Sequence, residues 1–289
     1  MDIKFILDEI EKADPEVYEK LSPRRDILKS FGSKVAVAAI PIAFGSLFTK
    51  AYGKTTSTVI DALNFALELE YLEYNFYYSC TNSAILSALI PTIDKAAFST
   101  ILANELAHVN FLRNAIHNAG STPYTPTHYS GDPVTGSPIV PAAYDFTAGG
   151  AFPVYSDYAT FLTVSQAFED TGVRAYKGQA GNLQSDHNIL TAALQIHSVE
   201  ARHAAHIRLI RRKAGAADAP KPWITGNTAP AAAVQANYNG ENNTMQLTVN
   251  ITSLPAVTGT VSSIAATESF DEPLDSATVA GLVAPFLLP

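Results

Sequence analysis

Two short segments of the chain pair a glutamate with a histidine three residues later. Glu105 and His108 form the first pair in ANELAHVNFLR, and Glu200 and His203 form the second in VEARHAAHIRLI. On a helix, residues three apart share one face, with their Cβ atoms about 5–6 Å apart. In the first segment the apolar residues lie on the same face, so the pair points towards a packed interior. A buried unpaired charge is very costly, which predicts a compensating group at this place.

Two other segments repeat a glutamate that is followed seven residues later by a tyrosine. Glu70 precedes Tyr77, and Glu169 precedes Tyr176. Seven residues are close to two turns of an α-helix, so each tyrosine lies on the same face as its glutamate. The chain therefore contains two copies of one helical hairpin, with a glutamate on the first helix and Glu-x-x-His on the second.

The chemistry of such a group of side chains follows from its charge. Four carboxylates that converge in a core repel one another, and some of them must stay protonated. Two divalent cations would supply the missing positive charge. Four carboxylates and two imidazoles suit Fe or Mn, and Zn is an alternative. The repeat therefore predicts a buried site for two metal ions.

Four long segments have the pattern of helices that can hold these groups in place. Each has about 20–28 residues and is about 30–40 Å long. Four helices of this length predict an all-α core in the form of a four-helix bundle. They run from Ser57 or Thr58 to about Cys80, from Asp94 to about Asn118, from Ser156 or Asp157 towards Gly181, and from Ser185 or Asp186 to about Lys213.

The connections between these helices differ in length. The first and third connections are short, which predicts two antiparallel helix pairs. The connection between helices two and three is a long crossover from Ala119 to Tyr155. A return along the full bundle needs about 11 extended residues. The remaining residues of the crossover are therefore free to form a lid or an interface.

The bundle is expected to occupy residues 55–215, and residues 216–289 are expected to form a C-terminal arm with little secondary structure. The segment TMQLTVNIT, residues 244–252, alternates apolar and polar side chains and predicts a short strand. A short helix is expected to begin near Asp275 or Ser276. The arm is interpreted as an appendage and not as a second domain.

Residues 1–54 are interpreted as an N-terminal leader. Arg24 and Arg25 precede a hydrophobic pair, Lys29 and a moderately apolar run. This order resembles a bacterial twin-arginine export signal and predicts a periplasmic or otherwise extracytoplasmic protein. The run contains Gly32 and Pro41, which disfavours a membrane span. An ordinary amphipathic helix with a basic end is the alternative, and cleavage of the leader is left open.

The composition excludes some classes of function. The chain has 289 residues and a formal net charge of −8, and 47% of its residues are hydrophobic. That length can bury a large core, and the acidic balance argues against a nucleic-acid partner. The single cysteine, Cys80, excludes an internal disulfide and is expected to be a small buried residue.

The double pattern of Glu and Glu-x-x-His resembles the ligand set of di-iron carboxylate proteins in the ferritin-like superfamily. In particular, the chain resembles secreted ferritin-like domain proteins related to plant desiccation-related proteins. The resemblance covers about residues 55–213, together with ESFDEPL in the tail. It implies a centre of two Fe ions per chain, with Mn or Zn as alternatives. Matched by motif position, the metal ligands would be Glu70, Glu105, His108, Glu169, Glu200 and His203.

The resemblance also implies a role for each ligand. Glu105 and Glu200 would bridge the two metals, while the other two glutamates and the two histidines would each bind one metal. Tyr77 and Tyr176 would lie beside the cofactor, where they would hydrogen-bond the bridging carboxylates or act as redox neighbours.

Three other residues compete for places in the site. Glu73 shares the face of Glu70 and is an alternative or additional ligand, whereas Glu68 lies roughly opposite and is expected to be solvated. Glu70 is preferred because it mirrors Glu169 relative to the following tyrosine. His206 shares the site face of its helix, and a core or rim position is the interpretation favoured for it.

The predicted function is that of an exported protein that binds a di-metal, in the first place di-iron, carboxylate centre. Such a centre can oxidise Fe(II) with dioxygen or peroxide, in metal handling or in protection from oxidants. The alternative is a structural or stress-protection scaffold without catalysis, in which the metal site is structural or vestigial. Metal ions are the expected partners, and a homo-oligomer is left open.

Overall fold

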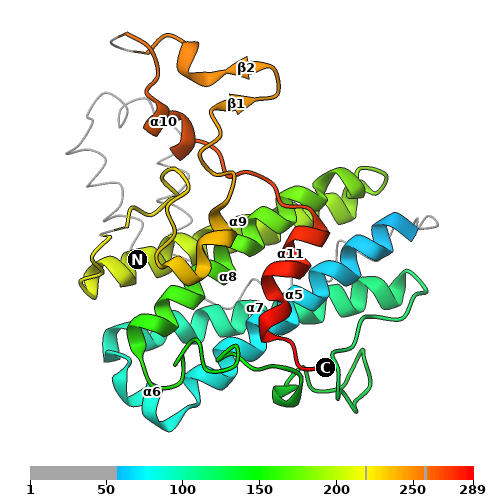
Figure 1. Ribbon diagram of the computed structural model, residues 1–289. Coiled ribbons are helices and arrows are strands. Elements are labelled where there is room, and N and C mark those ends of the chain that lie inside the picture. Colours follow the sequence, from blue (N-terminus) through cyan, green and yellow to red (C-terminus); the bar gives the residue numbers. More distant parts are fainter. Residues whose placement is uncertain (1–56, 219, 257–258) are drawn as a thin grey trace, which may run out of the picture. The chain divides into compact units, whose positions relative to one another are not determined.

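In a computed structural model of the chain, residues 57–218, 220–256 and 259–289 are described. Their centre is the predicted bundle of four long helices (Figure 1). Helix α5 packs mainly on α7 and α8 mainly on α9, and further contacts join the two pairs. The all-α core and the long crossover are confirmed. The bundle helices are α5 (Ser57–Thr81), α7 (Thr92–Asn118), α8 (Tyr158–Gln179) and α9 (His187–Lys213).

Local side-chain chemistry sets the ends of these helices close to the predicted ones. Asp157 Oδ1 accepts a hydrogen bond from the Thr160 N–H at 2.6 Å and so caps α8. Asp186 Oδ1 accepts from the N–H groups of Asn188 and Ile189, both at 3.1 Å, and caps α9. Gly215, with φ +84°, follows the last turn of α9, where a left-handed residue commonly ends a helix.

The first connection contains an element that the sequence pattern does not show. A short helix, α6 (Ala84–Leu89), lies between α5 and α7. The Ser83 hydroxyl accepts from the Leu86 N–H at 3.4 Å at its start. One and a half turns are too short for a helical period to stand out in the sequence.

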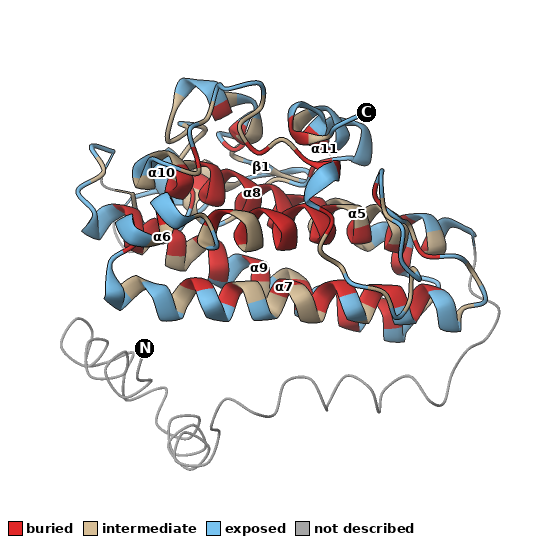
Figure 2. Cartoon of the chain, turned by 90° about the horizontal axis from the view of Figure 1, so that it is seen from below, coloured by how far each residue is buried: buried red, intermediate tan, exposed pale blue. Residues whose placement is uncertain are grey.

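The two kinds of bundle helix differ in burial. The middle parts of α5 and α8 are buried on every side, while α7 and α9 mix buried and exposed residues along their length (Figure 2). The additional cover on α5 and α8 comes from the crossover and the C-terminal arm. Asn75 of α5 donates to the Pro138 carbonyl at 2.9 Å and accepts from the Val140 N–H at 2.7 Å.

The C-terminal arm packs directly on α8. A Cβ atom added to Gly178 would lie 1.9 Å from the carbonyl oxygen of Leu274, so only glycine allows the arm to approach this closely. Arg174 donates to the carbonyls of Glu272 at 2.7 Å and Asn239 at 2.8 Å, and its Nε lies 2.6 Å from Glu241 Oε1. The arm is therefore fastened to the bundle by buried polar contacts.

The remaining elements are short. The crossover contains η1 (Pro141–Ala143), and the connection between α8 and α9 contains η2 (Ala180–Leu183). In the arm they are η3 (Ala232–Tyr238), β1 (Met245–Gln246), β2 (Val249–Asn250), η4 (Ile251–Ser253), α10 (Ser263–Glu268), α11 (Ser276–Val283) and η5 (Ala284–Phe286). Asp275 caps α11, whose start at Ser276 matches the predicted one.

The single strand predicted for residues 244–252 is wrong. The segment folds back on itself as an antiparallel hairpin, with Met245 opposite Asn250. Leu247 lies at its tip with φ +54° and is fully exposed. Among the described residues no neighbouring strand is available to pair with a longer one, and the Asn250 side chain accepts from the Thr252 N–H at 3.1 Å. Local turn contacts therefore outweigh the alternating pattern.

The predicted leader, residues 1–54, lies outside the described residues. Its twin-arginine motif stays a prediction. No helix in the described part of the chain combines the length and the apolar character that crossing a membrane requires.

Candidate metal centre

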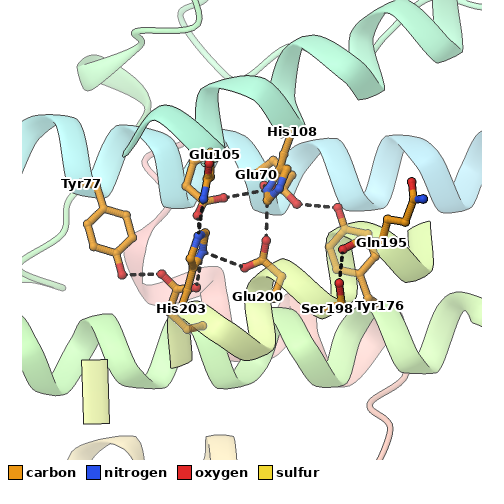
Figure 3. A network of polar contacts seen from close by, with 11 residues as sticks. Glu70, Tyr77, Glu105, His108, Tyr176, Gln195, Ser198, Glu200 and His203 are labelled. Carbon is orange, nitrogen blue, oxygen red and sulfur yellow. Dashed lines mark hydrogen bonds and ion pairs between the residues drawn. The ribbon is translucent and has the colours of Figure 1, made fainter. Parts of the chain in front are cut away.

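The six predicted ligands meet in the bundle core, and Figure 3 shows the cluster with each of them except Glu169 labelled. Each of the four long helices contributes, and every one of the six side chains is buried. They form two overlapping groups that can each hold a metal ion. The first group consists of Glu70, Glu105, His108 and Glu200, and the second of Glu105, Glu169, Glu200 and His203.

The first group is arranged around one ring nitrogen. His108 Nδ1 lies 3.1 Å from Glu70 Oε2, 3.0 Å from Glu105 Oε2 and 3.0 Å from Glu200 Oε1. A single N–H cannot direct its proton at three oxygens at once. The arrangement therefore has more acceptors than this imidazole can satisfy.

The second group repeats this arrangement around His203. Its Nδ1 lies 2.8 Å from Glu105 Oε1, 3.2 Å from Glu169 Oε2 and 3.9 Å from Glu200 Oε2. Glu105 and Glu200 thus present one carboxylate oxygen to each group. That is the placement a carboxylate needs to bridge two cations.

The residues present fit a pair of metal ions. Glu105 Oε1, Glu169 Oε2 and both oxygens of Glu200 are buried without a hydrogen bond, as is Nδ1 of His203. Unsatisfied buried polar atoms are rare and need an explanation. Neighbouring ligands at about 2.1 Å from a metal lie about 3 Å apart, which is close to the N···O distances around His108. A cation in each group would satisfy these atoms.

Tyr77 and Tyr176 hold two of the glutamates from across the bundle. The Tyr77 hydroxyl donates to Glu169 Oε1 at 2.5 Å, and the Tyr176 hydroxyl donates to Glu70 Oε1 at 2.5 Å. Each tyrosine therefore contacts the glutamate of the other helix pair. The expected bonds to the bridging carboxylates are not found, because the contacts go to Glu70 and Glu169. Each bond leaves the second oxygen of that glutamate facing a histidine.

Burial and the charges of neighbouring groups shift the pKa values of the site residues in different directions. Burial raises the pKa of Glu70 to about 7, although His108 opposes this. Burial and repulsion by Glu105 raise the pKa of Glu200 well above its usual range. Burial alone would raise the pKa of Glu105, but His203 and His108 together lower it. Burial disfavours charge on both imidazoles, yet the adjacent carboxylates raise their pKa values. A metal ion must displace these protons.

The competing residues take different positions. Glu73 is buried in α5, and a Cβ atom added to Gly172 would lie 3.2 Å from Glu73 Oε1 and 3.4 Å from Glu200 Oε2. Glu73 therefore lies beside the site without belonging to either group of potential ligands. Glu68, expected to be solvated, is half-buried, and burial raises its pKa. His206 is half-buried and lies outside both groups.

Sequence reasoning missed Asn104. Its Nδ2 lies 3.0 Å from His203 Nε2. A histidine that binds a metal through Nδ1 keeps its proton on Nε2, and that N–H needs an acceptor. The Asn104 amide can turn its oxygen to this position, because a flip exchanges its oxygen and nitrogen. The signal in the sequence was only an amide one residue before a ligand.

Comparison with known proteins agrees with this geometry. The family model described as ferritin-like domain matches residues 58–213, which span all four bundle helices and all six buried ligand candidates. The chain therefore belongs to the ferritin-like domain family. No curated protein sequence matches the chain.

Proposed function

We propose that this ferritin-like domain protein binds two metal ions, iron in the first place and Mn or Zn as alternatives, in its bundle core. The ligands would be Glu70, Glu105, His108, Glu169, Glu200 and His203. Glu105 and Glu200 would bridge the two ions, because each directs one oxygen to each histidine. The unsatisfied oxygens of these two carboxylates are the observation on which the proposal depends.

With iron bound, the centre would supply oxidation of Fe(II): two Fe(II) ions give up one electron each, and dioxygen takes two electrons and two protons to become hydrogen peroxide. The chain itself would bind and orient the metal ions and shield them from bulk water. Tyr77 and Tyr176 hold the two glutamates that are not shared between the groups. Complete burial of all four carboxylates excludes bulk water and strengthens their interaction with a cation.

The metal content of the full chain tests this proposal. We expect two iron or manganese ions per chain in protein purified from its native compartment, and loss of both in the Glu105→Ala/Glu200→Ala double variant. Removing these residues deletes the carboxylate oxygens shared by both groups. Helix content by circular dichroism controls for folding. Background metal in the wild type, with the same melting temperature for wild type and variant, would overturn the proposal.

A second candidate is a stress-protection scaffold in which the metal only stabilises the fold. The contacts between bundle and flanking segments favour it, since buried Arg174 fastens the arm and Asn75 fastens the crossover. Metal-loaded protein that consumes neither dioxygen nor peroxide with Fe(II), but melts at a higher temperature than the metal-free form, would support this candidate.

Export remains part of the proposal. It depends on Arg24 and Arg25 and on the apolar run after them, all outside the described residues. The kinship with desiccation-related proteins is likewise proposed from the sequence. Replacing both arginines by lysine should retain the protein in the cytoplasm, as cell fractionation would show.

A further inference from the structure

An apolar cavity lies at one end of the site, between the bundle helices. Its lining is almost entirely apolar and includes four alanines, and it contains Tyr176, whose hydroxyl donates to Glu70. The alanines that leave this space are Ala62, Ala66, Ala175 and Ala193. The cavity therefore reaches the tyrosine that holds a proposed ligand.

The internal repeat has larger side chains at the corresponding positions of the other end. When the hairpins are aligned on their glutamates, Ala62 corresponds to Phe161 and Ala175 to Phe76. Aligned in the same way, Ala193 of α9 corresponds to Phe98 of α7. At three positions the chain thus has alanine around Tyr176 and phenylalanine around Tyr77.

The three phenylalanines fill the opposite end. The ring centroids of Phe76 and Phe161 are 5.4 Å apart, and those of Phe98 and Phe161 are 5.1 Å apart. Tyr77 contacts the same cluster, with its ring 6.2 Å from Phe161 and 6.5 Å from Phe98. Tyr77 is therefore enclosed by packed rings, whereas its counterpart, Tyr176, borders the cavity.

The size and polarity of the cavity limit what it can hold. Its volume is about 20 Å³, and a single water needs about 10–15 Å³. Apolar cavities accept apolar guests such as xenon, as a larger engineered cavity of about 150 Å³ does. Hydrogen peroxide would lose its hydrogen bonds to water on entry, a cost that dioxygen does not have.

We propose that this alanine-lined cavity binds a small apolar gas and that dioxygen approaches the Glu70 side of the centre through it. The approach of dioxygen rests on the proposed function, because it requires a metal-loaded centre. Binding of a gas in the cavity does not require metal. The substrate at this end is thus dioxygen in preference to peroxide.

Xenon binding tests the cavity without any metal. In crystals of the full chain under xenon pressure, we expect anomalous density beside Tyr176 in both metal-free and loaded protein. Ala193→Phe, which copies Phe98 at the corresponding position, should abolish it, and Ala193→Leu provides a milder filling if the larger ring disturbs folding. Leu194→Phe is the matched control, since Leu194 is exposed and does not line the cavity. Wild-type crystals without xenon at this place would overturn the proposal.

The oxidant tests the route. In iron-loaded protein, Ala193→Phe should slow Fe(II) oxidation by dioxygen several-fold and leave oxidation by hydrogen peroxide unchanged, while Leu194→Phe changes neither. If Fe(II) oxidation by dioxygen has the same rate in the wild type and in a variant that no longer binds xenon, dioxygen does not reach the centre through the cavity. Protein that binds no iron would refute the proposed function, and the xenon result would still decide whether the cavity binds gas.

Discussion

The hairpin of α5 and α7 and the hairpin of α8 and α9 present the same carboxylate and imidazole groups in different surroundings. Both provide a glutamate, a Glu-x-x-His pair and a tyrosine that holds the glutamate of the other hairpin. Around those atoms they differ. Glu73 corresponds to Gly172, Asn104 corresponds to Val199, and three phenylalanines correspond to alanines. A symmetric set of ligand candidates thus has two unequal sides.

The arginines of the two hairpins also diverge. Arg113 and Arg208 both follow their glutamate by eight residues and both are buried. Arg113 donates to carbonyls of the crossover, at 3.0 Å to Asp132 and 2.8 Å to Gly136. Arg208 instead pairs with the buried carboxylate of Asp170. One arginine therefore orders a loop, and the other neutralises a charge.

The largest effect is expected from breaking this second contact. Arg208→Met leaves Asp170 buried without its cation, which should cost about 3–5 kcal/mol. Arg113→Met removes uncharged hydrogen-bond partners only, namely carbonyls of the crossover and the Tyr129 hydroxyl, which should cost about 1–3 kcal/mol. Urea unfolding followed by circular dichroism measures both.

Arg202→Met is the matched control for these two variants, because Arg202 is exposed on α9. It should change the free energy of unfolding by no more than about 0.5 kcal/mol. Equal costs for Arg113→Met and Arg208→Met would contradict the distinction between a loop anchor and a charge pair.

A smaller effect is expected at Asn104. Asn104→Leu removes the partner of His203 Nε2 and should weaken metal binding in the second group by about 10–100-fold. The group around His108 should keep its affinity, because among the described residues no hydrogen bond reaches His108 Nε2. Anaerobic calorimetric titration of metal-free protein with Fe(II) or Mn(II) would separate the two binding steps.

Two variants sharpen this result. Asn104→Asp keeps an oxygen acceptor for the His203 N–H and should restore the affinity. Val199→Asn supplies an amide at the corresponding position of the other hairpin and should make the affinities of the two metal-binding steps more similar. Uniform weakening of both steps in Asn104→Leu would show a general loss of packing instead.

The smallest effect concerns Glu73, and it depends on pH. Burial, followed by repulsion from Glu200, raises its pKa well above the model-compound value of 4.5. Above pH 4.5 the unfolded chain releases this proton while the folded chain keeps it, so metal-free wild type loses stability as pH rises. Glu73→Gln carries no such proton and should become more stable than the wild type as pH rises from 4.5 towards neutrality. Urea unfolding across this range measures the difference.

Glu68→Gln provides the control on the same helix. Glu68 is only half-buried, so its substitution should change the pH dependence less. A wild type and a Glu73→Gln variant with parallel stability curves would show that Glu73 is not held protonated by the fold.

Much of the fold could be predicted because its signals are local. Asp157 and Asp186 cap helices at the predicted places, and the repeat of Glu-x-x-His identifies the groups that meet in the core. The hairpin at Leu247 could not be predicted, since alternation of side chains is the same in one long strand and in two short ones. Short α6 was missed because it has no helical period to detect.

Side-chain spacing by itself determined which helix faces turn inward, because a period of 3.6 residues places a glutamate and the histidine three residues later on one face. It also determined that these inward faces carry carboxylates, from which the sequence predicts a metal site. Only the tertiary structure decided that Tyr77 holds Glu169 and Tyr176 holds Glu70, that Asn104 contacts His203, and where the alanines leave a cavity. These contacts join residues far apart in the chain, and their distances depend on how the helices pack against one another.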